Sequence, residues 1–150
     1  RALKQMAANA YDALRTSFPD SVRYTENYEK LLVRLDSLDT ACAEALRQAN
    51  VHTIVIYHPA LTYYAADYGL EQLAVEHDGK EPSARHLARL IEEARRKKVR
   101  RVFYQAQYPA STVKVIAEDI GARSVKIDPL REDVIGNIGE ITRQLTSGNE

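Results

Sequence analysis

Residues 53–70, TIVIYHPALTYYAADYGL, decide the fold that the sequence predicts. The stretch opens with a β-branched run, Thr53-Ile54-Val55-Ile56, which is typical of a strand buried on both faces of a parallel sheet. The run leads to His58, and a short helix rich in tyrosine follows until Gly69 ends it. In an open parallel sheet, ligands bind beyond the carboxyl ends of the strands. His58 therefore lies where such a sheet would place a ligating or catalytic side chain.

The rest of the chain alternates helices and strands around this stretch. We expect helices over residues 2–16, 20–48, 61–68, 83–98, 110–120 and 132–146, and strands over residues 53–57, 72–76, 101–104 and 124–127. This order predicts an α/β fold in which a four-stranded parallel sheet, joined by right-handed crossovers, is sandwiched by helices. The chain has 150 residues and no evident linker or repeat, so we expect a single α/β domain over residues 1–150.

The composition is that of an ordinary globular domain, with 45% hydrophobic and 28% charged residues. Because 21 Lys and Arg balance 21 Asp and Glu, there is no excess positive charge for nucleic acid or an anionic membrane. The locally basic residues 95–101 are interpreted as a helix C-terminus that complements the helix dipole, rather than as a phosphate-binding patch. We therefore expect no nucleic-acid partner.

The single cysteine, Cys42, leaves no partner for a disulfide within the chain. Its helical spacing from Leu38 and Leu46 favours a buried thiol over a nucleophile. No apolar run reaches the length of a membrane span, and the sequence shows no signal peptide. The chain begins at Arg1 in sequence that already has helical character, so we expect it to be a piece of a longer protein.

Polar side chains follow each of the four predicted strands. These are His58 after the first strand, His77 after the second, Gln105 and Gln107 after the third, and Asp128 after the fourth. Parallel strands share one carboxyl edge, so all of these residues should lie along the same edge of the sheet. By contrast, His52 precedes the first strand, and His86 is expected on a solvated helix face. Position alone thus separates His58 and His77 from the other two histidines.

An imidazole and a carboxylate, His58 and Asp128, are suitable ligands for zinc and related metals. Two ligands do not fill a tetrahedral zinc site, so further ligands would have to come from elsewhere. Three alternatives stay open. Asp128-Pro129 can be an ordinary turn, His58 and Asp128 can serve a small α/β enzyme as base and orienting group, and the domain can be a partner-binding scaffold. A recognisable nucleophile motif, a GxGxxG and a GxxxxGK[ST] are all absent from the sequence, so nucleotide binding has no support.

The stretch that begins at His58, HPALTYYAADYGL, resembles a box in the metal-binding subunits of ABC-type zinc and manganese importers, the TroA-like solute-binding proteins. That family's box is His-Asp-Ala-Phe-x-Tyr-Phe-x-x-x-Tyr-Gly-Leu, in the C-terminal lobe. The resemblance covers essentially the whole chain. It continues through residues 24–36, Glu81-Pro82-Ser83, residues 102–107, Gly121 and Ile127-Asp128-Pro129-Leu130.

The resemblance implies one lobe of a two-lobed metal receptor, in which a long rigid helix joins two α/β lobes and the metal lies in the cleft between them. His58 would be the third ligand and Asp128 the fourth. The other two ligands would come from an N-terminal lobe that is absent from this chain. Residues 2–16 would then be the end of the connecting helix or the helix after it.

The same resemblance implies a metal-ion binding protein, not an enzyme, that serves an ABC permease in the membrane. The expected location is periplasmic or extracellular, with a lipid anchor through the missing N-terminus as one form of attachment. A histidine rather than a glutamate at position 58 favours Zn²⁺ over Mn²⁺, because imidazole suits zinc and manganese prefers oxygen.

This sequence departs from the family pattern at two positions. Pro59 stands where an aspartate usually follows the ligand histidine, so the supporting role of that side chain is absent. Gln105 stands where a glutamate is common, which removes a negative charge from the cleft. We consider Gln105 and His77 as accessory ligands. The tyrosines near this edge, such as Tyr104 and Tyr108, are interpreted as packing residues whose hydroxyls reach water.

Overall fold

The computed structural model describes residues 1–76, 79–108 and 110–147. The chain divides into two compact units, Arg1–Glu44 and Ala45–Glu150, and each is described by itself. Within the described ranges, every helix is too short or too polar to span a lipid bilayer.

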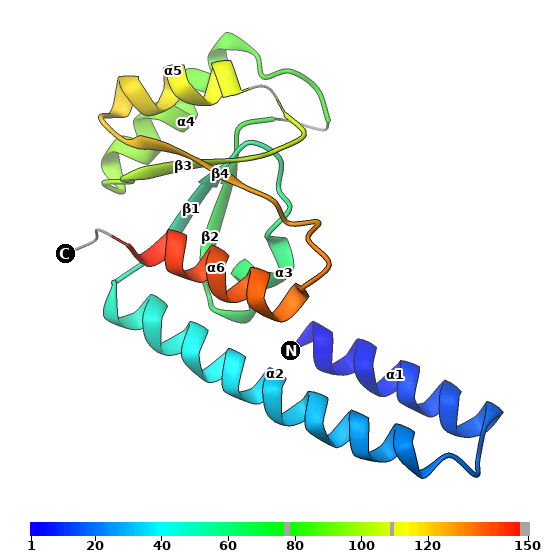
Figure 1. Ribbon diagram of the computed structural model, residues 1–150. Helices are drawn as coiled ribbons and strands as arrows, with labels where there is room; N and C mark the ends of the chain where they lie inside the picture. Colours follow the sequence, from blue (N-terminus) through cyan, green and yellow to red (C-terminus); the bar gives the residue numbers. More distant parts are fainter. Residues whose placement is uncertain (77–78, 109, 148–150) are drawn as a thin grey trace. The chain divides into compact units, whose positions relative to one another are not determined.

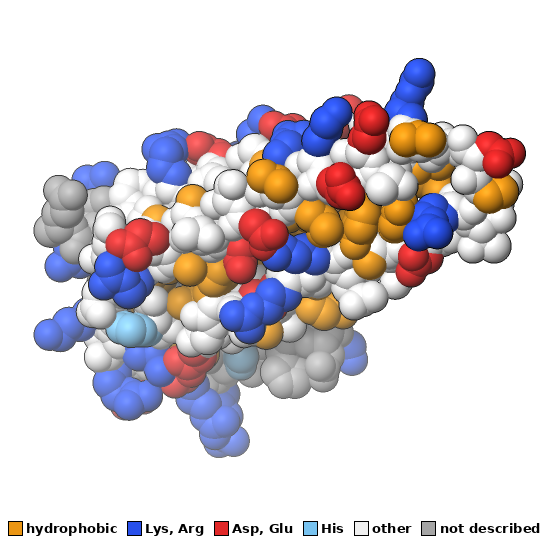
Figure 2. Space-filling model, turned by 90° about the horizontal axis from the view of Figure 1, so that it is seen from below, with side chains coloured by type: hydrophobic (Ala, Val, Ile, Leu, Met, Phe, Trp, Pro, Cys, Tyr) orange, Lys and Arg blue, Asp and Glu red, His pale blue; other side chains and the backbone are white. Residues whose placement is uncertain are grey.

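The first unit is a pair of antiparallel helices, α1 (Ala2–Ser17) and the greater part of α2 (Val22–Gln48). The rings of Tyr11 and Tyr28 stack at 4.3 Å between centroids, and the Tyr11 hydroxyl lies 2.9 Å from Thr25 Oγ1. An ion pair between Lys4 and Asp36 joins the other end of the pair. Figure 2 shows hydrophobic side chains, in orange, gathered on the surface of this helix pair.

The second unit contains a parallel sheet of four strands in the order β2-β1-β3-β4. The strands are β1 (Thr53–Ile56), β2 (Glu71–Ala74), β3 (Arg101–Gln105) and β4 (Arg123–Ile127). The helices of this unit are the end of α2, α3 (Thr62–Asp67), α4 (Ala84–Arg96), α5 (Ala110–Ile120) and α6 (Val134–Thr146). The predicted fold class, a four-stranded parallel sheet sandwiched by helices, is confirmed (Figure 1).

Each face of the sheet carries its own hydrophobic core, because successive side chains of a strand point to opposite faces. On one face Ile54 and Ile56 pack with residues of α6 and with Leu46 at the end of α2. On the other face Val55 packs with residues of α4 and α5, of which Val113 is fully buried. The β-branched run that predicted a doubly buried strand is indeed covered on both sides.

The strand order creates a switch point between β1 and β3. From β1 the chain moves through α3 to β2, and it then returns through α4 past β1 to β3 on the other side. Right-handed crossovers that run in opposite directions place their helices on opposite faces, so the loops diverge where β1 and β3 end. Ligand crevices of open α/β sheets form at such a point. His58 follows β1 there, and Gln105 ends β3.

Candidate metal centre

Strand register brings three side chains from three strands into line at the carboxyl edge of the sheet. Ile56 of β1 pairs with Ala74 of β2 on one side and with Phe103 of β3 on the other. Two residues further along each chain are His58, Glu76 and Gln105. The backbone stays in register beyond β1 and β2, since Val75 N donates to Ile56 O and Glu76 N donates to Tyr57 O.

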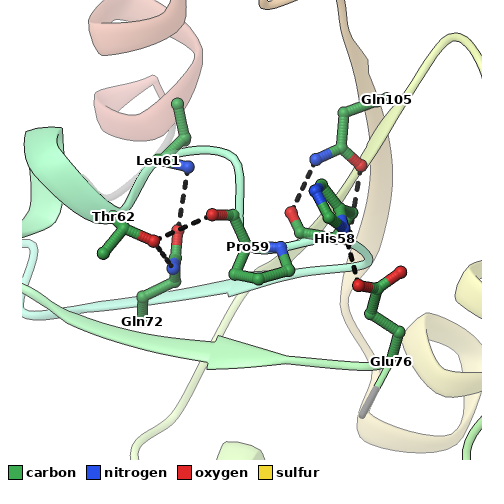
Figure 3. A network of polar contacts seen from close by, with 7 residues as sticks. All are labelled: His58, Pro59, Leu61, Thr62, Gln72, Glu76 and Gln105. Carbon is green, nitrogen blue, oxygen red and sulfur yellow. Dashed lines mark hydrogen bonds and ion pairs between the residues drawn. The ribbon is translucent and has the colours of Figure 1, made fainter. Parts of the chain in front are cut away.

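Gln105 holds the main chain of His58. Its Nε2 donates to the His58 carbonyl oxygen at 2.6 Å, and its Oε1 accepts from the His58 N–H at 3.4 Å. Only 2% of Gln105 is exposed. Figure 3 shows the amide facing the His58 backbone. Because both ends of the amide bond to this backbone, the strand end is fixed in position.

Glu76 and Tyr108 hold the imidazole ring of His58. The Nδ1 atom lies 2.6 Å from Glu76 Oε1 (Figure 3). The Glu76 side chain is only 8% exposed. The Tyr108 ring stacks on the imidazole with 5.4 Å between centroids. Within the described residues no hydrogen bond to His58 Nε2 is recorded, and the His58 side chain is 42% exposed. The ring thus offers Nε2 to an incoming ligand.

A second amide network shapes the loop that follows His58. Gln72 accepts from the Leu61 N–H at 3.0 Å and donates to Thr62 Oγ1 at 3.0 Å. Thr62 Oγ1 in turn donates to the Pro59 carbonyl oxygen at 2.8 Å. These bonds satisfy backbone groups at the start of α3, which has no side-chain cap of its own. Figure 3 shows this network beside the imidazole.

The phenol of Tyr57 remains neutral beside the site. Burial raises the pKa of Tyr57, and the nearby Glu81, Glu76 and Tyr108 raise it further. The Tyr57 and Tyr108 rings lie 5.0 Å apart. A phenol with a raised pKa does not supply an anionic oxygen at neutral pH, so Tyr57 serves as packing for the site.

Asp128 follows β4 and is shaped by a local turn. Its Oδ1 accepts from the Leu130 N–H at 3.1 Å, and its carbonyl oxygen accepts from Asn137 Nδ2 at 2.9 Å. Asp128 is half-buried and lines a polar groove of about 410 Å³ together with residues of α6 such as Glu140. The predicted turn at Asp128-Pro129 is present, and it leaves the carboxylate at the edge of the sheet.

β3 lies between the strands that carry His58 and Asp128. The described part of the chain has no group of three or more His, Cys, Asp and Glu side chains that could hold a metal ion. The carboxylate bonded to His58 is Glu76, so the enzyme hypothesis in which Asp128 orients His58 is not supported by the geometry.

The other predicted residues take different places. Gln105 is buried with its amide on the His58 backbone, whereas Gln107 is exposed. His77 lies outside the described residues. His52 is exposed at the opposite edge, with Nε2 2.9 Å from Asn50 Oδ1. Cys42 is buried, as predicted.

His86 corrects an expectation, because it is not on a solvated face. Its Nε2 lies 3.1 Å from the Ala74 carbonyl oxygen at the end of β2, and the residue is half-buried. The sequence also gave no direct sign of Glu76 as a partner of His58. Position 76 lies opposite position 58 because β1 and β2 pair in parallel in the register Ile56 with Ala74, which the residues of the predicted strand over 72–76 do not specify.

Comparison with known proteins defines the class of protein to which this chain and its fold belong. The chain matches the family described as zinc-uptake complex component A, periplasmic (ZnuA), over residues 1–146. The chain belongs to the ZnuA family. The resemblance to TroA-like solute-binding proteins is thereby confirmed.

Several relatives show the extent of the likeness. The chain is 31% identical over 133 residues to the zinc-binding lipoprotein AdcA of Streptococcus pneumoniae R6, a match that covers 87% of this chain. It is 27% identical over 115 residues, 75% of this chain, to the high-affinity zinc uptake system protein ZnuA of Bacillus subtilis 168. A crystal structure of ZnuA superposes with a TM-score of 0.92 at 29% identity and covers 99% of this chain. The fold is also that of the periplasmic zinc-binding protein TroA of Treponema pallidum, with a TM-score of 0.79 at 17% identity.

The chain spans only part of each relative. It covers 26% of the AdcA protein, 36% of the Bacillus ZnuA protein and 58% of the crystallised ZnuA chain.

Proposed function

We propose that this chain is the C-terminal lobe of a zinc-binding solute receptor and contributes half of its metal site. His58 Nε2 would donate one ligand atom and the Asp128 carboxylate another. The observation that carries the proposal is the His58 ring, whose Nδ1 is bonded to Glu76 while its side chain is 42% exposed at the switch point of the sheet. A metal-binding histidine typically has this arrangement, with one ring nitrogen on a carboxylate and the other on the metal.

The spacing of the two ligands is compatible with one ion. β1 and β4 are two strand spacings apart, which is about 9–10 Å between backbones. An imidazole reaching from one strand end and a carboxylate from the other can approach a common ion, since zinc bonds to nitrogen and oxygen are about 2.0–2.2 Å long. Two ligands leave positions open, and we propose that another lobe of the full-length protein fills them.

Zinc is the metal that the donor set favours, and manganese is the competitor to test. Imidazole nitrogen suits zinc, whereas manganese prefers carboxylate, carbonyl and water oxygens. A crystal structure of a ZnuA deletion mutant with zinc bound superposes on this chain with a TM-score of 0.90 at 29% identity. This likeness supports zinc as the cargo.

We further propose a binding role without catalysis, in which the loaded receptor delivers its metal to an ABC permease. The location that fits this role is the periplasm or the cell exterior, with a lipid anchor as one form of attachment. The names of the relatives, a zinc-binding lipoprotein and a high-affinity zinc uptake system protein, support this assignment.

The test is a calorimetric zinc titration of this chain and of two matched variants, His58→Ala and His52→Ala. We expect weak binding by the unchanged chain, because only part of the coordination sphere is present. Changing a group that merely supports a ligand lowers metal affinity about 10–100-fold, so loss of the ligand His58 should lower it at least tenfold. His52→Ala should leave the affinity unchanged, since His52 is exposed at the opposite edge. Equal affinities for all three proteins would refute the assignment of His58.

A further inference from the structure

We infer that Glu76 is a positioning residue that fixes His58 in the tautomer and orientation needed to bind zinc. The inference rests on the proposed function. It goes beyond that function in assigning a role to a residue that follows β2, whereas the two proposed ligands follow β1 and β4.

The first argument is the contact itself. Glu76 Oε1 lies 2.6 Å from His58 Nδ1, a short distance typical of hydrogen bonds that involve an ionised group. A carboxylate can only accept, so the proton of this bond belongs to Nδ1. With Nδ1 protonated, the neutral ring carries its lone pair on Nε2, which is the atom that a metal would use.

The second argument is burial. The Glu76 side chain is 8% exposed while the His58 side chain is 42% exposed, so the carboxylate lies on the inner side of the imidazole. A buried carboxylate is costly unless it has a partner. His58 Nδ1 is the partner that the structure records for it among the described residues. Glu76 therefore contacts the ring through Nδ1 on its buried side and leaves Nε2 accessible.

The third argument is the register of the sheet. Glu76 is set opposite His58 by the parallel pairing of β1 with β2, and its N–H donates to the Tyr57 carbonyl oxygen at 3.0 Å. The Glu76 backbone is thus hydrogen-bonded to the residue that precedes His58, which fixes the carboxylate relative to the imidazole. Proline at position 59 has no side-chain acceptor, and Glu76 supplies one from the neighbouring strand.

The experiment compares Glu76→Ala, Glu76→Gln and the control Glu71→Gln, which changes an exposed carboxylate of the same strand. Long-range ¹H–¹⁵N spectra of the metal-free proteins report the tautomer of His58, and calorimetry reports zinc affinity. We expect one Nδ1–H tautomer in the unchanged chain and in Glu76→Gln, because the glutamine oxygen still accepts the bond. Glu76→Ala should show both tautomers and bind zinc about 10–100-fold more weakly. Glu71→Gln should match the unchanged chain in both measurements.

A single Nδ1–H tautomer in Glu76→Ala would overturn the inference whatever the zinc affinity. Unchanged zinc affinity in Glu76→Ala, with a tenfold loss in His58→Ala, would overturn it and leave the proposed function standing. Unchanged affinity in His58→Ala itself would refute the proposed function. If Glu76→Ala fails to fold, Glu76→Leu replaces it, because Leu is closer to Glu in size and also lacks an acceptor for His58 Nδ1. Both tautomers in a folded Glu76→Leu protein would support the inference, and a single Nδ1–H tautomer would overturn it.

Discussion

The position of the His58 backbone depends on the Gln105 side chain as much as on β1. The amide bonds to both the N–H and the carbonyl oxygen of the His58 backbone, at a point where β1 has already ended. A glutamate at this position could accept but could not donate to the carbonyl oxygen. The glutamine that departs from the family pattern therefore has a structural explanation in this chain, and we leave it out of the proposed ligand set.

Replacing Gln105 with Met should destabilise the protein by about 1–3 kcal/mol. The substitution conserves length but leaves two backbone groups of His58 without a partner in a buried place. Chemical denaturation monitored by circular dichroism measures the free energy of unfolding. The matched control is Gln107→Met, an exposed residue two positions away, which should change that free energy by less than about 0.5 kcal/mol. Equal effects at the two positions would contradict the role given to Gln105.

Single residues were partly predictable from the sequence. His58 and Asp128 could be placed because each lies just beyond the end of a strand that the sequence indicates. Glu76 could not be identified as the partner of His58 because its role depends on which strands pair and in what register. His86 was misplaced for the same reason, since its contact is with the end of β2 and not with its own helix.

The helices of the second unit attach to the sheet through one face each. In α5, Val113 and Ile116 are buried, whereas Val115 is 65% exposed. This spacing follows from 3.6 residues per turn, which brings positions three apart to the same side and turns the position between them outward.

A Val→Ala substitution should therefore lower the free energy of unfolding by very different amounts on the two faces of α5. Val113→Ala removes buried methyl groups from the core and leaves a cavity, so we expect a loss of roughly 1–3 kcal/mol in the free energy of unfolding. Val115→Ala should lie within about 0.5 kcal/mol of the unchanged protein. Thermal and urea unfolding of both variants provide the comparison. A cost at Val115 as large as at Val113 would mean that α5 packs by another face.

The boundaries of helices and of strands were both predicted to within two residues at each end. The predicted helix over residues 110–120 has the observed bounds of α5, and Gly121, at a φ of 68°, follows its last residue. The second strand was expected over residues 72–76 but spans Glu71–Ala74. Pairing with β1 decides these limits, since the Glu71 N–H already donates to the His52 carbonyl oxygen. Such non-local pairing is not visible in the strand's own residues.

At the scale of the whole molecule, the sequence predicted a parallel sheet but not the order of its strands. The order β2-β1-β3-β4 is what makes the carboxyl edge of β1 and β3 a switch point and sets β3 between the two proposed ligands. Alternating strands and helices are compatible with several orders, because each crossover can move in either direction. The proposed half-site therefore depends on the assembled sheet rather than on any one motif.

The central claim is that His58 and Asp128, carried on β1 and β4, bind the same zinc ion. A double-mutant cycle with His58→Ala, Asp128→Asn and the double variant tests this most directly, with zinc affinity measured by calorimetry. Two ligands of one ion should be coupled, so the second substitution should cost much less when the first is already present, with an interaction energy of about 0.5–3 kcal/mol. The two single variants each lose some zinc-binding free energy. If the sum of these losses equals the loss in the double variant within about 0.3–0.5 kcal/mol, the two residues act independently, which would contradict a shared site.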